Sequence, residues 1–115
     1  MTILVVEDHD DSRQLLVAWL HDAGYRTREA RHGGEALAVL ADHEDIGMVL
    51  LDLNMPVMSG WEVLKQIEVN PQWCQLPLAL VTAMAGHDLP PGYTVIAKPL
   101  DVDALLRTVR AAETS

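Results

Sequence analysis

The sequence has little cysteine, few basic residues and no long apolar segment, and each shortage excludes a class of protein. Its single cysteine, Cys74, cannot form an internal disulfide and has no second cysteine with which to build a zinc site. A formal net charge of −9 argues against direct binding of nucleic acid, which requires clustered cations. No apolar run approaches the roughly 20 residues of a membrane span. We therefore expect a cytoplasmic protein without membrane insertion.

The length of 115 residues corresponds to about one domain. Half of the residues are hydrophobic, so the chain can bury a core. We expect a single domain over residues 1–115. The histidines contain no i, i+4 pair, and we interpret them as solvated or helix-capping residues rather than metal ligands. They are His9, His21, His32, His43 and His87.

Apolar runs typical of buried strands alternate along the chain with apolar residues at helical spacing. We expect strands at residues 2–6, 25–30, 48–51, 76–81 and 93–97, and the charged second strand is expected at a sheet edge. Helices are expected over residues 11–23 and 34–42, from 60 onward and from 102 onward. This alternation predicts an α/β fold with a doubly wound, five-stranded parallel sheet.

The third helix has a clear start signal. Ser59 followed by Glu62 has the spacing of a capping box, in which a side-chain oxygen at the N-cap accepts a backbone amide. We expect the helix that follows to bury Trp61, Leu64 and Ile67.

The connection between the fourth and fifth strands is short. About ten residues, 83–92, are left for it, and they include Gly86, Pro90 and Pro91. Parallel strands normally need a connection of about a dozen residues, usually helical, and tandem prolines cannot continue a helix. We predict that the fourth helix is absent or reduced to about one turn.

Polar residues stand where the predicted strands end. They are Glu7, Asp8, Asp52, Thr82 and Lys98. Ligands of doubly wound sheets bind in the crevice outside the carboxyl ends of the strands. Three carboxylates in one crevice repel each other unless a cation offsets their charge, and Mg²⁺ prefers such oxygen ligands.

These residue types suit phosphoryl transfer. Charge spreads over three equatorial oxygens in its transition state, and a metal ion, Lys98 and the Thr82 hydroxyl could stabilise that charge. A carboxylate can act as the nucleophile and become an aspartyl phosphate.

Four motifs occur in a fixed order, each after its own predicted strand. They are Glu7-Asp8, Asp52-Leu53-Asn54-Met55-Pro56-Val57-Met58-Ser59-Gly60, Thr82-Ala83 and Lys98-Pro99. With these motifs the sequence resembles the response-regulator receiver family of two-component signalling, from residue 3 to about residue 109. The resemblance implies a flavodoxin-like strand order of 2-1-3-4-5.

The resemblance also implies a metal site and a phosphoacceptor. Asp52 would accept a phosphoryl group from a phosphohistidine donor and would also bind Mg²⁺. Asp8 would bind the metal directly, Glu7 would act mostly through a water, and the backbone carbonyl of Asn54 would be a further ligand.

Other features implied by the resemblance concern the remaining motifs and the partners. Lys98 would contact one phosphoryl oxygen, Thr82 another, and the Lys98-Pro99 bond would be cis. A histidine kinase or a histidine phosphotransfer protein would supply the phosphoryl group, and a downstream protein would respond to it. The protein would catalyse its own phosphorylation and dephosphorylation rather than turn over an external substrate.

The sequence departs from the family pattern at one position. An aromatic residue usually stands three residues before the lysine, and here Val95 does, with Tyr93 two residues earlier. We therefore expect partners to dock on the first helix and the loops around the site rather than on the fourth helix and fifth strand.

Three alternative functions differ from this one in the residues that they require. A phosphorylation-independent adaptor with the same fold is the main alternative, although such proteins usually lose part of the acidic set. A phosphatase of the haloacid-dehalogenase type would need a second acid at the position of Asn54. Flavin binding is disfavoured because the first strand–helix loop is acidic.

Overall fold

The computed structural model describes residues 1–53, 59–83 and 89–113. Within them, five parallel strands form one sheet in the order β2-β1-β3-β4-β5. The strands are β1 (Thr2–Val6), β2 (Arg26–Ala30), β3 (Ile46–Asp52), β4 (Leu78–Thr82) and β5 (Thr94–Ala97). This order confirms the doubly wound, flavodoxin-like arrangement, with the charged strand β2 at an edge as expected.

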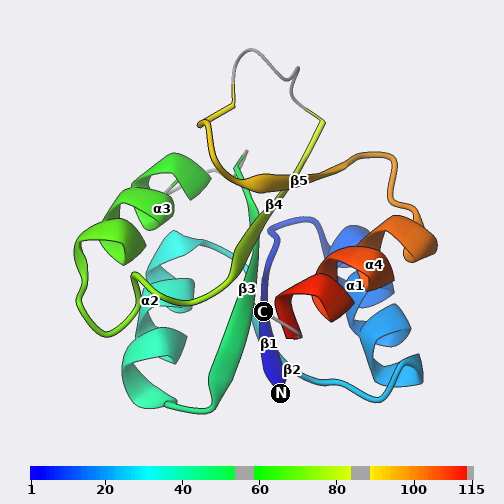
Figure 1. Cartoon of the computed structure of the whole chain (residues 1–115), viewed down its shortest axis with the longest axis horizontal. Helices are drawn as coiled ribbons and strands as arrows, with labels where there is room; N and C mark the ends of the chain where they lie inside the picture. The colour runs from blue at the N-terminus through cyan, green and yellow to red at the C-terminus, as the bar shows by residue number, and fades with distance from the viewer. Residues whose placement is uncertain (54–58, 84–88, 114–115) are drawn as a thin grey trace.

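Helices cover both faces of the sheet (Figure 1). α1 (Asp10–Asp22) and α4 (Val102–Glu113) pack on one face, and α2 (Gly33–Asp42) and α3 (Gly60–Val69) pack on the other. Side chains of β1 alternate between the two cores: Leu4 and Val6 enter the α2/α3 core, and Ile3 and Val5 enter the α1/α4 core. The uninterrupted apolar run of β1 follows from burial on both sides.

A histidine is the N-cap residue of two helices. The Nδ1 atom of His9 accepts the amide of Ser12 at 3.4 Å at the start of α1. The Nδ1 atom of His32 accepts the amide of Glu35 at 3.2 Å at the start of α2. The capping interpretation is therefore confirmed for these two histidines.

The buried face of α3 differs from the one that the sequence predicted. Trp61 is 39% exposed, so the expectation that it is buried was wrong. The amide of Gly60 donates to the carbonyl of Leu53 at 3.0 Å, and a Cβ atom at Gly60 would collide with the backbone carbonyl of Asp52. This close approach directs Trp61 outward and sets the buried stripe at i, i+3, i+4 and i+7, which consists of Gly60, Val63, Leu64 and Ile67.

The connection from β4 to β5 is only partly described. Residues 83 and 89–93 are not helical, and residues 84–88 lie outside the described residues. The absent or shortened fourth helix therefore stays a prediction. The end of the connection is tied to α3, because the hydroxyl of Tyr93 donates to Oε2 of Glu68 at 2.5 Å.

Both described ends of the chain lie at the amino-terminal edge of the sheet. Met1 precedes β1, and its side chain packs beside Gly47 near the start of β3. At the other end, Ala112 of α4 shares a cavity of about 250 Å³ with Leu78 and Thr94, the first residues of β4 and β5. The carboxyl ends of the strands, where the polar motifs stand, lie at the opposite edge.

Candidate functional site

Three acidic side chains meet at the carboxyl edge of the sheet. Glu7 and Asp8 follow β1, and Asp52 is the last residue of β3. The two strands are neighbours with Val6 opposite Leu51, so Glu7 emerges beside Asp52. Each of the three acids offers a carboxylate oxygen within 4.8 Å of the others. Glu7 is 1% exposed and Asp52 3%, whereas Asp8 is less buried than either.

Lys98 brings a positive charge into this acidic cluster. Its Nζ atom donates to Oε1 of Glu7 at 2.6 Å and lies 3.6 Å from Oδ2 of Asp52. The Lys98-Pro99 bond is cis, as the family resemblance implied. Burial lowers the pKa of Lys98, but its hydrogen bond to Glu7 and the negative charge of Asp52 more than offset this, and the pKa lies above its usual value. The side chain is therefore held as a cation.

Thr82 lies at the same edge of the sheet. It is the buried last residue of β4, one position beyond Val81, which pairs with Asp52. Its carbonyl accepts the amide of Lys98 at 3.0 Å. Asn54, the other predicted metal ligand, lies outside the described residues.

The residues present fit a divalent cation. Among the described residues, the three acidic side chains of the cluster outnumber the ammonium group of Lys98. Oε2 of Glu7 is also buried and has no hydrogen-bond partner among the described residues, an arrangement that is costly for a charged oxygen. A hard ion such as Mg²⁺, bound directly or through a water, would balance the charge and satisfy this oxygen.

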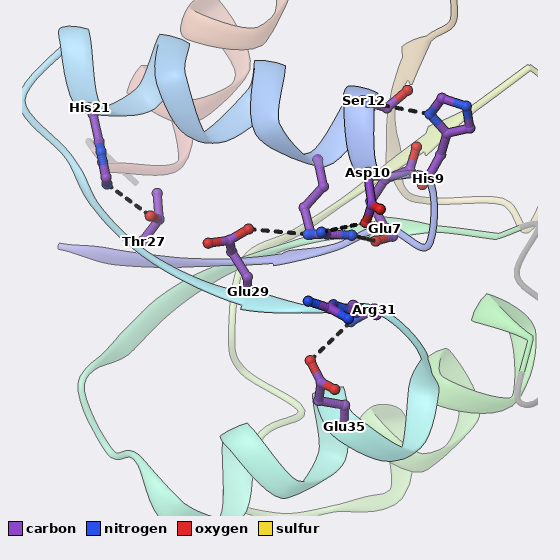
Figure 2. Close-up of polar contacts among 10 residues, drawn as sticks. Glu7, His9, Asp10, Ser12, His21, Thr27, Glu29, Arg31 and Glu35 are labelled. Carbon is purple, nitrogen blue, oxygen red and sulfur yellow. Dashed lines mark hydrogen bonds and ion pairs between the residues drawn. The ribbon is translucent and has the colours of Figure 1, made fainter.

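One charged residue next to the site was not expected from the sequence. Arg13 is only 5% exposed, although it belongs to α1. It donates to the backbone carbonyl of Glu7, to Asp10 and to Glu29, three residues that are labelled in Figure 2. The signal was present in the helical spacing: Arg13 stands three residues before Leu16, on the stripe that faces the core.

The match to known proteins agrees with this geometry. Residues 3–110 match the family model of the response regulator receiver domain. The chain belongs to this family. It is thus a receiver domain of the kind found in two-component signalling, and its helices and strands follow the arrangement of solved receivers.

Individual relatives show the contexts in which such receiver domains occur. The chain is 42% identical over 87 residues to a Vibrio cholerae protein named "Probable cyclic di-GMP phosphodiesterase", a match that covers 76% of the chain and 19% of the relative. It is 37% identical over 115 residues to the sensor histidine kinase RcsC of Salmonella typhi, covering 95% of the chain and 12% of the kinase. Both relatives are therefore much longer proteins.

A solved structure provides a comparison of similar length. The chemotaxis response regulator CheY4 of Vibrio cholerae superposes on the receiver domain with a TM-score of 0.88 at 28% identity. The match covers 96% of this chain and 97% of that one. In the described parts of the chain, no helix has the length and apolar character needed to cross a membrane.

Proposed function

We propose that this receiver domain accepts a phosphoryl group from a phosphohistidine donor onto Asp52, in the presence of Mg²⁺, and that the modification changes which proteins it binds. The observation that carries the proposal is the meeting of three carboxylates and Lys98 around one buried oxygen of Glu7 that has no hydrogen-bond partner in the part of the chain that the structure describes. An adaptor that is never phosphorylated would not require such an acidic cluster.

The same cluster would hold the metal ion. Asp8 and Asp52 would bind it directly, Glu7 through a water, and the backbone carbonyl of Asn54 would complete the protein ligands. When bound, Mg²⁺ supplies positive charge that stabilises the phosphoryl oxygens.

Asp52, Lys98 and Thr82 would have separate roles in the phosphoryl transfer. A carboxylate oxygen of Asp52 attacks phosphorus and forms a P–O bond, while the P–N bond to the donor histidine breaks and its electron pair stays on the imidazole nitrogen. Lys98, already held as a cation beside Asp52, binds a phosphoryl oxygen. Thr82, at the end of the adjacent strand, donates its hydroxyl to another. The donor histidine would belong to a histidine kinase or a histidine phosphotransfer protein.

The test is phosphate uptake from a radiolabelled small donor, acetyl phosphate or phosphoramidate. We expect the wild-type protein to gain an acid-labile, hydroxylamine-sensitive phosphate with Mg²⁺ but not with EDTA, and Asp52→Asn to gain none while remaining folded. Asp42→Asn, which changes an exposed acid at the end of α2, is the matched control and should be labelled like the wild type. Equal labelling of Asp52→Asn would show that another residue is the nucleophile. An unlabelled wild-type protein would favour the phosphorylation-independent adaptor.

A further inference from the structure

The backbone of Glu7 is fixed on both sides. Its amide donates to the carbonyl of Ala30 at the end of β2 at 3.0 Å. Its carbonyl accepts a hydrogen bond from Nη1 of Arg13 at 3.2 Å, in a buried contact. Both polar backbone groups of the residue that follows β1 are therefore paired, and this fixes the direction in which the Glu7 carboxylate and the neighbouring Asp8 leave the sheet.

Arg13 is itself held in place by two acids. Nη2 donates to Asp10 in the first turn of α1 at 2.6 Å, and Nε donates to Glu29 of β2 at 3.1 Å. One planar guanidinium thus joins the end of β1, the start of α1 and the neighbouring strand (Figure 2). Because the N–H donors of a guanidinium lie in one rigid plane, the position of each of the three acceptors restricts the positions of the other two.

The charge of Arg13 is already neutralised at its own position. Asp10 and Glu29 together carry more negative charge than the single guanidinium offsets. Arg13 therefore acts on the acidic cluster by orienting the backbone of Glu7. It does not add an unpaired cation that would repel a metal ion.

We propose that Arg13 is a positioning residue for the metal site: by binding the Glu7 carbonyl it holds Glu7 and Asp8 in the arrangement that a divalent cation requires. The inference deepens the proposed function and rests on it. Residues that orient metal ligands from outside the ligand set typically contribute about 10–100-fold to metal affinity.

The experiment measures Mg²⁺ affinity by isothermal titration calorimetry in three variants. Arg13→Met removes all the donors but keeps much of the stem. Arg13→Lys keeps the charge but has one nitrogen, which cannot reach three acceptors in three segments. Arg107→Met, which changes an exposed arginine on α4, is the matched control. Circular dichroism and thermal unfolding confirm that each variant is folded.

We expect the dissociation constant for Mg²⁺ to rise about 10-fold or more in Arg13→Met and by an intermediate factor in Arg13→Lys. In metal-free protein, the Glu7 amide should exchange its hydrogen faster in both variants. Arg107→Met should match the wild type. A residue with only a structural role would lower the melting temperature and leave the affinity of the folded protein within about twofold, and this result would overturn the proposal.

The outcomes separate this inference from the proposed function. If Arg13→Met fails to fold, Arg13→Lys decides, and unchanged affinity in that variant overturns the role of Arg13. A wild-type protein that binds Mg²⁺ but takes no phosphate would defeat the proposed function alone. A wild-type protein that binds no Mg²⁺ would defeat both.

Discussion

At the scale of single residues, three acidic side chains of the described part of the chain converge beside Lys98. Lys98 is closer to Glu7 than to Asp52, with nitrogen–oxygen distances of 2.6 and 3.6 Å. Lys98 therefore interacts more closely with Glu7 than with Asp52. Repulsion between the carboxylate of Asp52 and those of Glu7 and Asp8 is expected to lower the stability of the metal-free protein.

Asp52→Asn should consequently stabilise the metal-free protein. Removing one crowded charge is expected to increase the free energy of unfolding by about 1 kcal/mol, which corresponds to about 4 °C in melting temperature for a domain of this size. The measurement is thermal unfolding in EDTA, with Asp42→Asn as the control. Mg²⁺ should then raise the melting temperature of the wild type more than that of Asp52→Asn. A lower melting temperature for Asp52→Asn in EDTA would contradict this account of the repulsion.

The residues that sequence reasoning located correctly share one property. Glu7, Asp8, Asp52 and Lys98 each follow an apolar run, and the carboxyl ends of parallel strands meet at one edge of the sheet. Arg13 was missed because a charged residue on the apolar stripe of a helix is not expected to be buried, and its pairing with Glu29 of β2, 16 residues away, is not recorded by apolar patterning. The roles of the site residues themselves stay predictions.

At the scale of the elements, α3 shows how a start signal and a packing constraint act together. Ser59 accepts the amide of Glu62 at 3.4 Å, which confirms the N-cap half of the predicted capping box. The start of the helix could thus be predicted from the sequence. Its rotation could not, because the close approach of Gly60 to the Asp52 carbonyl is a contact between two elements and leaves no periodic signal.

Gly60→Ala should therefore destabilise the protein and disturb the end of β3. The added methyl group would meet backbone atoms of Asp52 and Leu53, and overpacking of this kind costs about 1–3 kcal/mol. Urea denaturation measures the loss. Gly34→Ala in α2 is the control, because its Cβ would meet only the His32 ring at 3.4 Å, and an alanine in a helix is expected to be neutral or favourable by up to about 1 kcal/mol. Equal stabilities for the two variants would count against the close packing at Gly60.

At the scale of the whole molecule, one layer of helices packs on each face of the sheet. Polar contacts also join segments that are distant in the sequence. The bond between Tyr93 and Glu68 connects the approach to β5 with α3. Burial, and then the hydrogen bond to Glu68, raise the pKa of Tyr93 to about 12. The neutral phenol is thus favoured in the folded state over the unfolded chain, in which a tyrosine ionises near pH 10.

This shift predicts a specific loss of stability in alkali. The contribution of Tyr93 is fully present below about pH 10 and disappears as the pH rises towards 12, since the unfolded chain releases its proton first. The difference in unfolding free energy between the wild type and Tyr93→Phe should shrink over this interval. Glu68→Gln should lower the pKa of Tyr93, which absorbance titration of the phenols measures. Ionisation of Tyr93 near pH 10 in the wild type would contradict the partly buried, hydrogen-bonded state of its phenol.

The positions of the two chain ends have a consequence for how this domain can be used in larger proteins. Both described ends lie at the edge of the sheet opposite the acidic cluster. A polypeptide attached at either end would begin at the edge of the sheet opposite Asp52. A longer protein that contains this domain at its beginning, in its middle or at its end could therefore keep the edge that carries the acidic cluster accessible in each arrangement.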